Sequence, residues 1–95
     1  MWFLLLTACP HTPDPVAGEA VYRRTCVSCH GDDGAAGVQV DGVAASDLAT
    51  VVPTLDDDTL DVVVVDGIGA MPAQNLDPID AADCVAWLRE AFPAR

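Results

Sequence analysis

The sequence predicts an all-α fold with three main helices, at residues 15–30, 54–66 and 78–92. Three observations support this prediction. Asp14-Pro15 and Asp77-Pro78 each place an N-cap aspartate before a proline, and proline at the first helical position is typical of a helix start. Thr54 precedes an acidic run, which suits the positive end of a helix. The chain has 95 residues, enough for one domain.

The middle segment carries conflicting signals. Thr54 is a plausible N-cap, Asp56–Asp58 would lie in the first turn, and Gly67 is a typical terminator. Val62–Val65 are β-branched and by propensity favour a strand. We predict a helix, with one side formed by Leu55, Thr59, Val62, Val63 and Asp66. The acidic run is also a candidate set of calcium ligands, although a solvated helix start is the simpler interpretation.

The other segments are easier to interpret. Residues 31–42 contain four glycines and three aspartates, the composition of a surface loop. The last helix continues from Pro78 through Cys84, Val85, Trp87 and Leu88 to Phe92, before Pro93.

The composition restricts the partners of this protein. The formal net charge is −11 and the chain has no lysine, so its surface repels nucleic acids and anionic lipid headgroups. The acidity has two interpretations: solubility or adaptation to a salty environment, or docking to a basic face of a partner. Only five residues are aromatic, which favours a bound group that fills the centre of so small a domain.

The N-terminus predicts export and a lipid anchor. The apolar run before Cys9 is far too short to span a bilayer and is typical of the end of a signal peptide. Leu6-Thr7-Ala8-Cys9 resembles the bacterial lipobox, in which the cysteine is diacylated and begins the mature chain. We therefore expect a signal peptide at residues 1–8, a lipidated Cys9 with a proline-rich tether at 9–15, and a domain at 16–95.

Two features leave the lipobox interpretation open. The basic region that usually opens a signal peptide is missing and the apolar run is short, which favours a start codon upstream of Met1. A plain secretory signal with a spare cysteine is the alternative. His11, in the tether, is expected to be a solvated loop residue and not a ligand.

The strongest motif is Cys26-Val27-Ser28-Cys29-His30. CxxCH is the attachment site of haem c: two thiols one helical turn apart add to the haem vinyl groups, and the histidine binds the iron. A redox dithiol and half of a zinc site are the alternatives. A zinc site needs further ligands, and only Cys84 and His11 remain, at unsuitable spacing.

With this motif the chain resembles the class I c-type cytochromes. In that family, a glycine and an aromatic residue precede the first cysteine at the offsets of Gly18 and Tyr22, and a glycine follows the histidine, as Gly31 does here. The resemblance implies a cytochrome c fold around one covalent haem c. It makes Cys26 and Cys29 the thioether positions and His30 the proximal iron ligand.

The resemblance also supplies a second iron ligand. Gly67-Ile68-Gly69-Ala70-Met71-Pro72 is similar to the family loop that carries the axial methionine, so Met71 is the expected distal ligand. Cys84 and Trp87 stand where the family places the residues that meet Gly18 and Tyr22. Cys84 is then a small buried apolar residue and not a bonding thiol, so no disulfide is expected.

One position departs from the family pattern. The family's proline, whose carbonyl accepts a hydrogen bond from the proximal histidine, is replaced by Ser46. The carbonyl of Ser46 can still accept this bond, but the loop should be less rigid.

The resemblance implies a one-electron carrier of a bacterial respiratory or other periplasmic chain. It would have redox proteins as partners and neither nucleic acid nor small-molecule substrate. Six-coordinate iron leaves no open site, which argues against an enzyme. Two other classes stay open: a haem-based enzyme or gas sensor with a labile sixth ligand, and a lipoprotein whose CxxCH is a redox dithiol.

Overall fold

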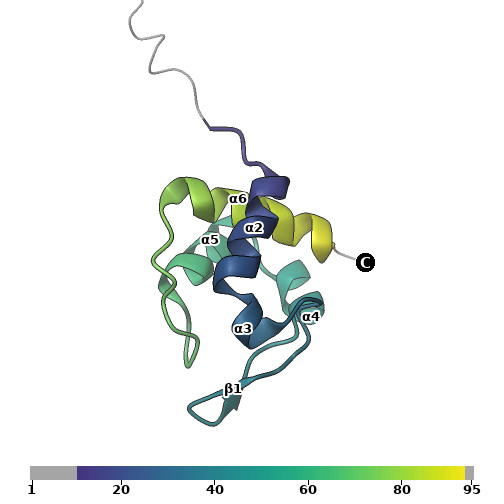
Figure 1. Ribbon diagram of the computed structural model, residues 1–95, viewed down its shortest axis with the longest axis vertical. Coiled ribbons are helices and arrows are strands. Elements are labelled where there is room, and N and C mark those ends of the chain that lie inside the picture. Colours follow the sequence, from purple (N-terminus) through teal and green to yellow (C-terminus); the bar gives the residue numbers. More distant parts are fainter. Residues whose placement is uncertain (1–10, 94–95) are drawn as a thin grey trace, which may run out of the picture.

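The computed structural model describes residues 11–93, and within them the fold is mostly helical, as predicted (Figure 1). The predicted signal peptide and Cys9 lie outside the described residues. The elements are, in chain order, helices α2 (Pro15–Thr25) and α3 (Val27–His30), strands β1 (Gln39–Val40) and β2 (Val43–Ala44), helix α4 (Leu48–Val51), the 3₁₀ helix η1 (Val52–Thr54), and helices α5 (Asp57–Asp66) and α6 (Pro78–Ala91). No helix in this part of the chain combines the length and the apolar composition that a membrane span requires.

The first and last helices begin where the sequence predicts. The Asp14 carboxylate accepts the amide of Val16 at 2.9 Å, and the Asp77 carboxylate accepts that of Asp80 at 2.8 Å. The predicted helix 15–30 is divided at Cys26, which ends α2 and caps α3. The last helix ends at Ala91, one residue before the predicted boundary.

The middle segment is a helix and not a strand, but its predicted start is wrong. Asp56 caps α5, because its carboxylate accepts the amide of Thr59 at 2.8 Å. Thr54 instead ends η1, where its hydroxyl donates to the carbonyl of Val51 at 2.7 Å. Of the residues predicted to share one side, Leu55, Thr59 and Val63 line one cavity, whereas Val62 is exposed. The buried residues of α5 are Leu60 and Val64.

The segment between α3 and α5 is more structured than the loop that its composition predicts. Residues 39–44 form a short antiparallel hairpin, in which Gln39 pairs with Ala44 and Val40 with Val43. The turn consists of Asp41 and Gly42, both with positive φ. Asp47 then caps α4 by accepting the amide of Ala49 at 3.0 Å.

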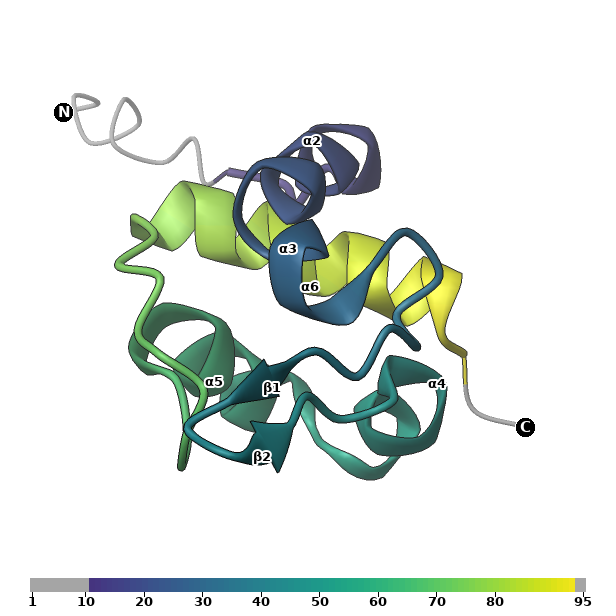
Figure 2. The same ribbon diagram turned by 60° about the horizontal axis from the view of Figure 1, so that its bottom comes forward.

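The core is centred on the crossing of α2 over α6, which Figure 2 shows from a second side. A Cβ on Gly18 would lie 1.8 Å from the carbonyl oxygen of Asp83, so only glycine permits this close approach. The Tyr22 and Trp87 rings pack with centroids 4.6 Å apart, and Cys84 is fully buried. These contacts agree with those that the family resemblance implies for the two helices.

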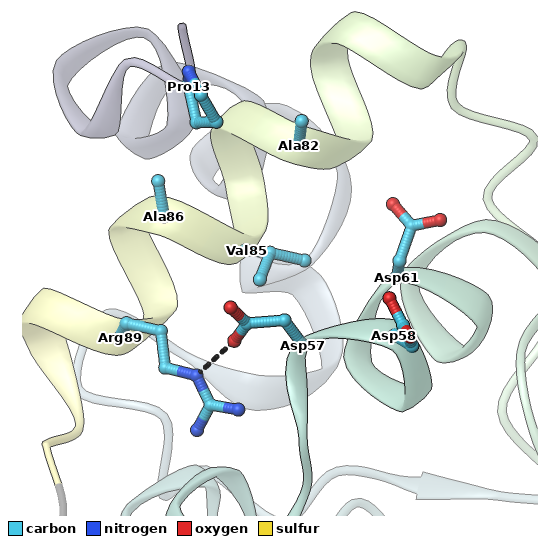
Figure 3. Close-up of a pocket in the computed structure, with 8 residues that line it drawn as sticks. All are labelled: Pro13, Asp57, Asp58, Asp61, Ala82, Val85, Ala86 and Arg89. Carbon is cyan, nitrogen blue, oxygen red and sulfur yellow. Dashed lines mark hydrogen bonds and ion pairs between the residues drawn. The ribbon is translucent and has the colours of Figure 1, made fainter.

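Arg89 joins α6 to the segment that leads into α5. Its guanidinium donates to the carbonyls of Val52 and Leu55, and its Nε lies 2.7 Å from the Asp57 carboxylate (Figure 3). Helix α5 also forms one wall of the cavity that His30 and Met71 line, so this contact helps to fix that wall to the core.

His11 is an exposed loop residue, as the sequence predicts, but its ring also makes a specific contact with the body of the domain. Its Nε2 lies 2.5 Å from Oδ1 of Asp83, a buried residue of α6. The sequence carries no local signal for this contact, because the two residues are 72 positions apart.

Candidate cofactor-binding site

A cavity of about 400 Å³ brings together the four side chains that the sequence singles out as cofactor residues. Cys26, Cys29, His30 and Met71 all contribute to its lining. Most of the other lining residues are apolar and come from the hairpin, α4, η1, α5, α6 and the segments before and after α5. They include Val40, Val43, Val51, Val52, Leu55, Leu60, Val63, Val64, Ile68 and Leu88. The volume is within the range typical of cofactor and ligand pockets, roughly 300–1,000 Å³.

The CxxCH motif lies where α2 ends and α3 begins. Cys26 occupies the junction, and Cys29 and His30 follow within the single turn of α3. Gly31 then ends the turn with a φ of 79°, a left-handed conformation that favours glycine. The motif therefore presents both thiols and the imidazole from one short, turned segment.

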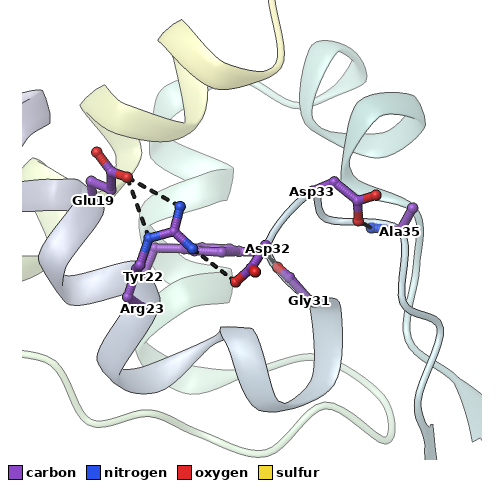
Figure 4. A network of polar contacts seen from close by, with 7 residues as sticks. All are labelled: Glu19, Tyr22, Arg23, Gly31, Asp32, Asp33 and Ala35. Carbon is purple, nitrogen blue, oxygen red and sulfur yellow. Dashed lines mark hydrogen bonds and ion pairs between the residues drawn. The ribbon is translucent and has the colours of Figure 1, made fainter.

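Polar contacts hold this segment against α2 (Figure 4). The hydroxyl of buried Tyr22 donates to the carbonyl of Gly31 at 2.6 Å, and burial raises the pKa of Tyr22 to about 12, so the phenol stays a donor. On the surface, the Arg23 guanidinium lies between Glu19, at 3.1 Å, and Asp32, at 2.8 Å.

The imidazole of His30 is buried and oriented from one side. Its Nδ1 lies 3.0 Å from the carbonyl oxygen of Ser46. Because a carbonyl only accepts, Nδ1 carries a proton in this contact, and in the neutral imidazole Nε2 then has the lone pair. The bond expected at the position of the family's proline is therefore present, although Ser46 replaces that proline.

The Met71 loop leaves α5 through Gly67, whose φ is 78°. A Cβ at Gly67 would lie 2.3 Å from the carbonyl oxygen of Met71, so the chain folds back tightly at this point. Ile68 and Met71 exchange two backbone hydrogen bonds, of 3.2 and 2.9 Å. The side chain of Met71 is half-buried, whereas that of Ile68 is 65 % exposed.

Sequence reasoning missed one neighbour of the attachment thiols. The Cys84 thiol lies beside that of Cys26, and its contact with Cys26 lowers the pKa of Cys26. The same contact, together with burial, raises the pKa of Cys84. Spacing along the chain does not reveal this pair, which forms because α2 crosses α6. Among residues 11–93 no disulfide joins the cysteines.

The residues that line the cavity fit a covalently attached haem with one iron. Two thiols lie on one wall, an imidazole with a free Nε2 lies beside them, and a thioether sulfur belongs to the loop of another wall. The remaining walls suit an apolar macrocycle. No group of three His, Cys, Asp or Glu side chains within the described range is arranged to bind a metal ion, and this includes the Asp56–Asp58 run.

Comparisons with known proteins agree with this geometry. Residues 13–88 match the family model described as cytochrome c oxidase, cbb3-type, subunit III. The chain is also 33 % identical over 73 residues to cytochrome c-551 of Bacillus subtilis (strain 168). The aligned region covers 77 % of this chain and 60 % of that relative, so the chain spans less than two thirds of the relative's length.

Proposed function

The chain belongs to the class I c-type cytochromes with one covalent haem c, and we propose that it is a one-electron carrier with His30 and Met71 as axial ligands. In this proposal Cys26 and Cys29 form the two thioethers. The observation that carries it is the cavity of about 400 Å³, which is lined by these four side chains and otherwise mostly by apolar groups. The haem supplies the iron, which changes between the ferric and ferrous states.

His30 suits the proximal position because its orientation is fixed before any metal binds. His30 Nδ1 donates a hydrogen bond to the carbonyl oxygen of Ser46, with 3.0 Å between the two atoms, and the side chain is buried. A histidine whose second nitrogen is bonded in this way presents Nε2 in one tautomer and orientation, and it is a more basic ligand. Little therefore has to rearrange when the charge on the iron changes.

Met71 suits the distal position because its sulfur is a soft, uncharged ligand. A histidine–methionine pair raises the reduction potential relative to two histidines. Pro72 follows it and cannot donate a backbone hydrogen bond, which restricts the loop at the ligand. With both axial positions filled by protein, no position remains for a substrate, and this supports a carrier rather than an enzyme.

The edge of the cavity is the natural contact surface for redox partners. The exposed side chains Val43 and Ile68, on the hairpin and the Met71 loop, belong to its uncharged lining. The chain has a net charge of −11, with acidic residues close to this lining such as Asp41 in the hairpin turn, and this charge attracts a basic partner from a distance. We therefore expect electron transfer to a basic partner to slow as salt is added. A rate that does not depend on ionic strength would contradict the basic docking face.

We further propose that the protein is exported and held at a bacterial envelope membrane by lipid on Cys9. The lipobox-like Leu6-Thr7-Ala8-Cys9 supports this anchor. Mass spectrometry of the protein from a bacterial host tests it directly. A mature chain that begins at a diacylated Cys9 is expected, whereas an unmodified Cys9 would exclude the anchor.

The electron-carrier proposal is tested by a visible spectrum of the protein matured with a haem-attachment system. We expect the spectrum of covalent low-spin haem, with a far-red band of methionine bound to iron(III). The spectrum of the reduced protein should not change when carbon monoxide is added. A spectrum that shifts with carbon monoxide would favour a haem enzyme or gas sensor. A colourless protein with free thiols would favour the redox-dithiol alternative.

A further inference from the structure

The segment before α2 is fastened to the body of the domain by one buried carboxylate. Oδ1 of Asp83 lies 2.5 Å from Nε2 of His11 and accepts the backbone amide of Asp14 at 2.8 Å. Asp14 in turn caps α2. A contact between residues 11 and 83 thus links the tether to the middle of α6. We call the His11–Asp83 contact the clasp.

The clasp supplies a hydrogen bond that the buried carboxylate of Asp83 needs. The carboxylate is only 4 % exposed, and a buried carboxylate is costly unless hydrogen bonds compensate for the lost water. Hydrogen bonds from His11 and from the backbone of Asp14 lower the pKa of Asp83, so these bonds stabilise the charged form. Both donors belong to the tether and the start of α2, so Asp83 is best satisfied when the tether lies against α6.

The clasp also determines from which end of the domain the tether leaves. In both ribbon views, the chain before α2 emerges at the end of the molecule opposite the β1–β2 hairpin (Figures 1 and 2). The hairpin contributes Val40 and Val43 to the lining of the cofactor cavity. The exit of the tether and this edge of the cavity therefore face in opposite directions.

We propose that the clasp orients the anchored domain, so that the exposed edge of its cofactor cavity faces away from the membrane, toward water-soluble redox proteins or extramembrane redox domains. This inference rests on the lipid anchor of the proposed function. With the clasp closed, the two residue steps from Cys9 to His11 reach at most about 7 Å. With the clasp open, the five steps to Asp14 reach about 17 Å, and the domain can turn on its anchor.

The first test examines the clasp without a membrane. In the haem-loaded, reduced protein made without lipid, ¹⁵N relaxation should give residues 11–13 order parameters of a rigid backbone, about 0.85. His11→Ala should lower them below about 0.6, the range of flexible segments. His11→Gln, which keeps a donor for Asp83, should restore part of the order, and Thr12→Ala is the matched control in the same exposed segment.

The second test measures orientation on vesicles. A nitroxide is attached to one introduced cysteine, Val16→Cys beside the tether or Val43→Cys at the cavity edge, both exposed positions. The native cysteines do not compete, because Cys26 and Cys29 carry the haem, Cys84 is fully buried and Cys9 carries lipid. The depth of each label in the lipidated, reduced protein is measured from the collisional relaxation of the nitroxide. The label at 16 should lie near the lipid and the label at 43 far from it. His11→Ala should remove most of this difference.

Rigid residues 11–13 together with a label difference that requires His11 support the proposal. Flexible residues 11–13 in the unaltered protein overturn the clasp, whether or not the lipid is present. A rigid tether in a protein that does not bind vesicles overturns the anchor, and with it the orientation. Equal depths of the two labels in the anchored protein overturn the orientation alone.

Discussion

The two walls of the cofactor cavity are built in different ways. The proximal wall, formed by α2 and α3 with His30, is backed by α6 through the contact of Gly18 with Asp83 and the stacking of Tyr22 on Trp87. The distal wall, the 67–77 loop with Met71, is held by a few backbone hydrogen bonds and exposes Ile68. The proximal wall is thus part of the core, whereas the distal wall depends more on the group that it contacts.

This difference indicates how changes at the two proposed iron ligands should differ in effect. Changes on the proximal side should act on the whole fold, because its residues also form the helix crossing. Changes on the distal side should act on the sixth coordination position and leave most of the fold in place. The predictions below test this division, beginning with the largest expected effect.

Removal of the haem should unfold both walls. Cys26→Ala with Cys29→Ala abolishes covalent attachment and leaves a cavity of about 400 Å³ in a small domain. A dry, empty cavity of this size would cost on the order of 10 kcal/mol, comparable to the whole free energy of unfolding of a typical domain, about 5–15 kcal/mol. We expect no cooperative transition in denaturant, followed by circular dichroism.

Cys84→Ala is the control for this variant, because it removes a buried thiol and keeps both attachment cysteines. It should retain haem and a cooperative transition. A haem-free double variant that unfolds cooperatively, like the native protein, would show that apolar packing alone maintains the cavity.

The helix crossing should be the next most sensitive feature. Gly18→Ala places a Cβ 1.8 Å from the backbone oxygen of Asp83, and no side-chain rotation can relieve a clash with backbone. We expect a loss of at least about 3 kcal/mol in the free energy of unfolding of the haem protein. Gly42→Ala, at a hairpin glycine with nothing within 4 Å, should cost only the strain of its positive φ, about 1–2 kcal/mol. Equal losses in the two variants would refute the crossing as the centre of the proximal wall.

The two walls also differ in how well the sequence predicts them. The proximal wall was largely predictable, because caps such as Asp14-Pro15 and the CxxCH spacing act over a few residues. Local signals misplaced the start of α5, since Thr54 and Asp56 are both good caps and only the packing of η1 decides between them. The clasp and the Cys26–Cys84 pair depend on contacts between distant segments, for which this single sequence holds no signal. The hairpin is local, and Asp41-Gly42 between Val40 and Val43 is a hairpin signal that a loop prediction from composition overlooks. The role of Met71 came from the family resemblance and stays a prediction.

Loss of Met71, the proposed distal ligand, should change the spectrum more than the stability. Met71→Ala removes the thioether but leaves the helices in place, so the reduced protein should now bind carbon monoxide while its free energy of unfolding falls by about 1–3 kcal/mol. Ile68→Ala, an exposed neighbour in the same loop, is the control and should leave the spectrum unchanged. A Met71→Ala protein that still does not bind carbon monoxide would mean that another group occupies the sixth coordination position of the iron.

Acid should weaken the helix that carries the distal loop. Hydrogen bonds from the hydroxyl and backbone of Thr59 lower the pKa of Asp56 below its ordinary value of 3.8. A lowered pKa contributes stability that is present above the ordinary value and is lost as the pH falls through the folded value. Asp56→Asn keeps a good N-cap without the charge, so its unfolding free energy should depend less on pH below about 4 than that of the unaltered protein. Parallel pH profiles of the two proteins would exclude this contribution.

The smallest expected effect concerns the loop that orients His30. Ser46 supplies only its backbone carbonyl to Nδ1, and that contact is available to any residue. Ser46→Pro keeps the carbonyl and restricts the unfolded chain, so it should raise the free energy of unfolding by about 0.4–1 kcal/mol if the local backbone accepts proline. Ser46→Ala is the control and should be neutral. A destabilised Ser46→Pro protein with an altered haem spectrum would mean that the backbone at residue 46 has a conformation that proline cannot adopt. In that case the rigid part of the proximal wall would not include residue 46.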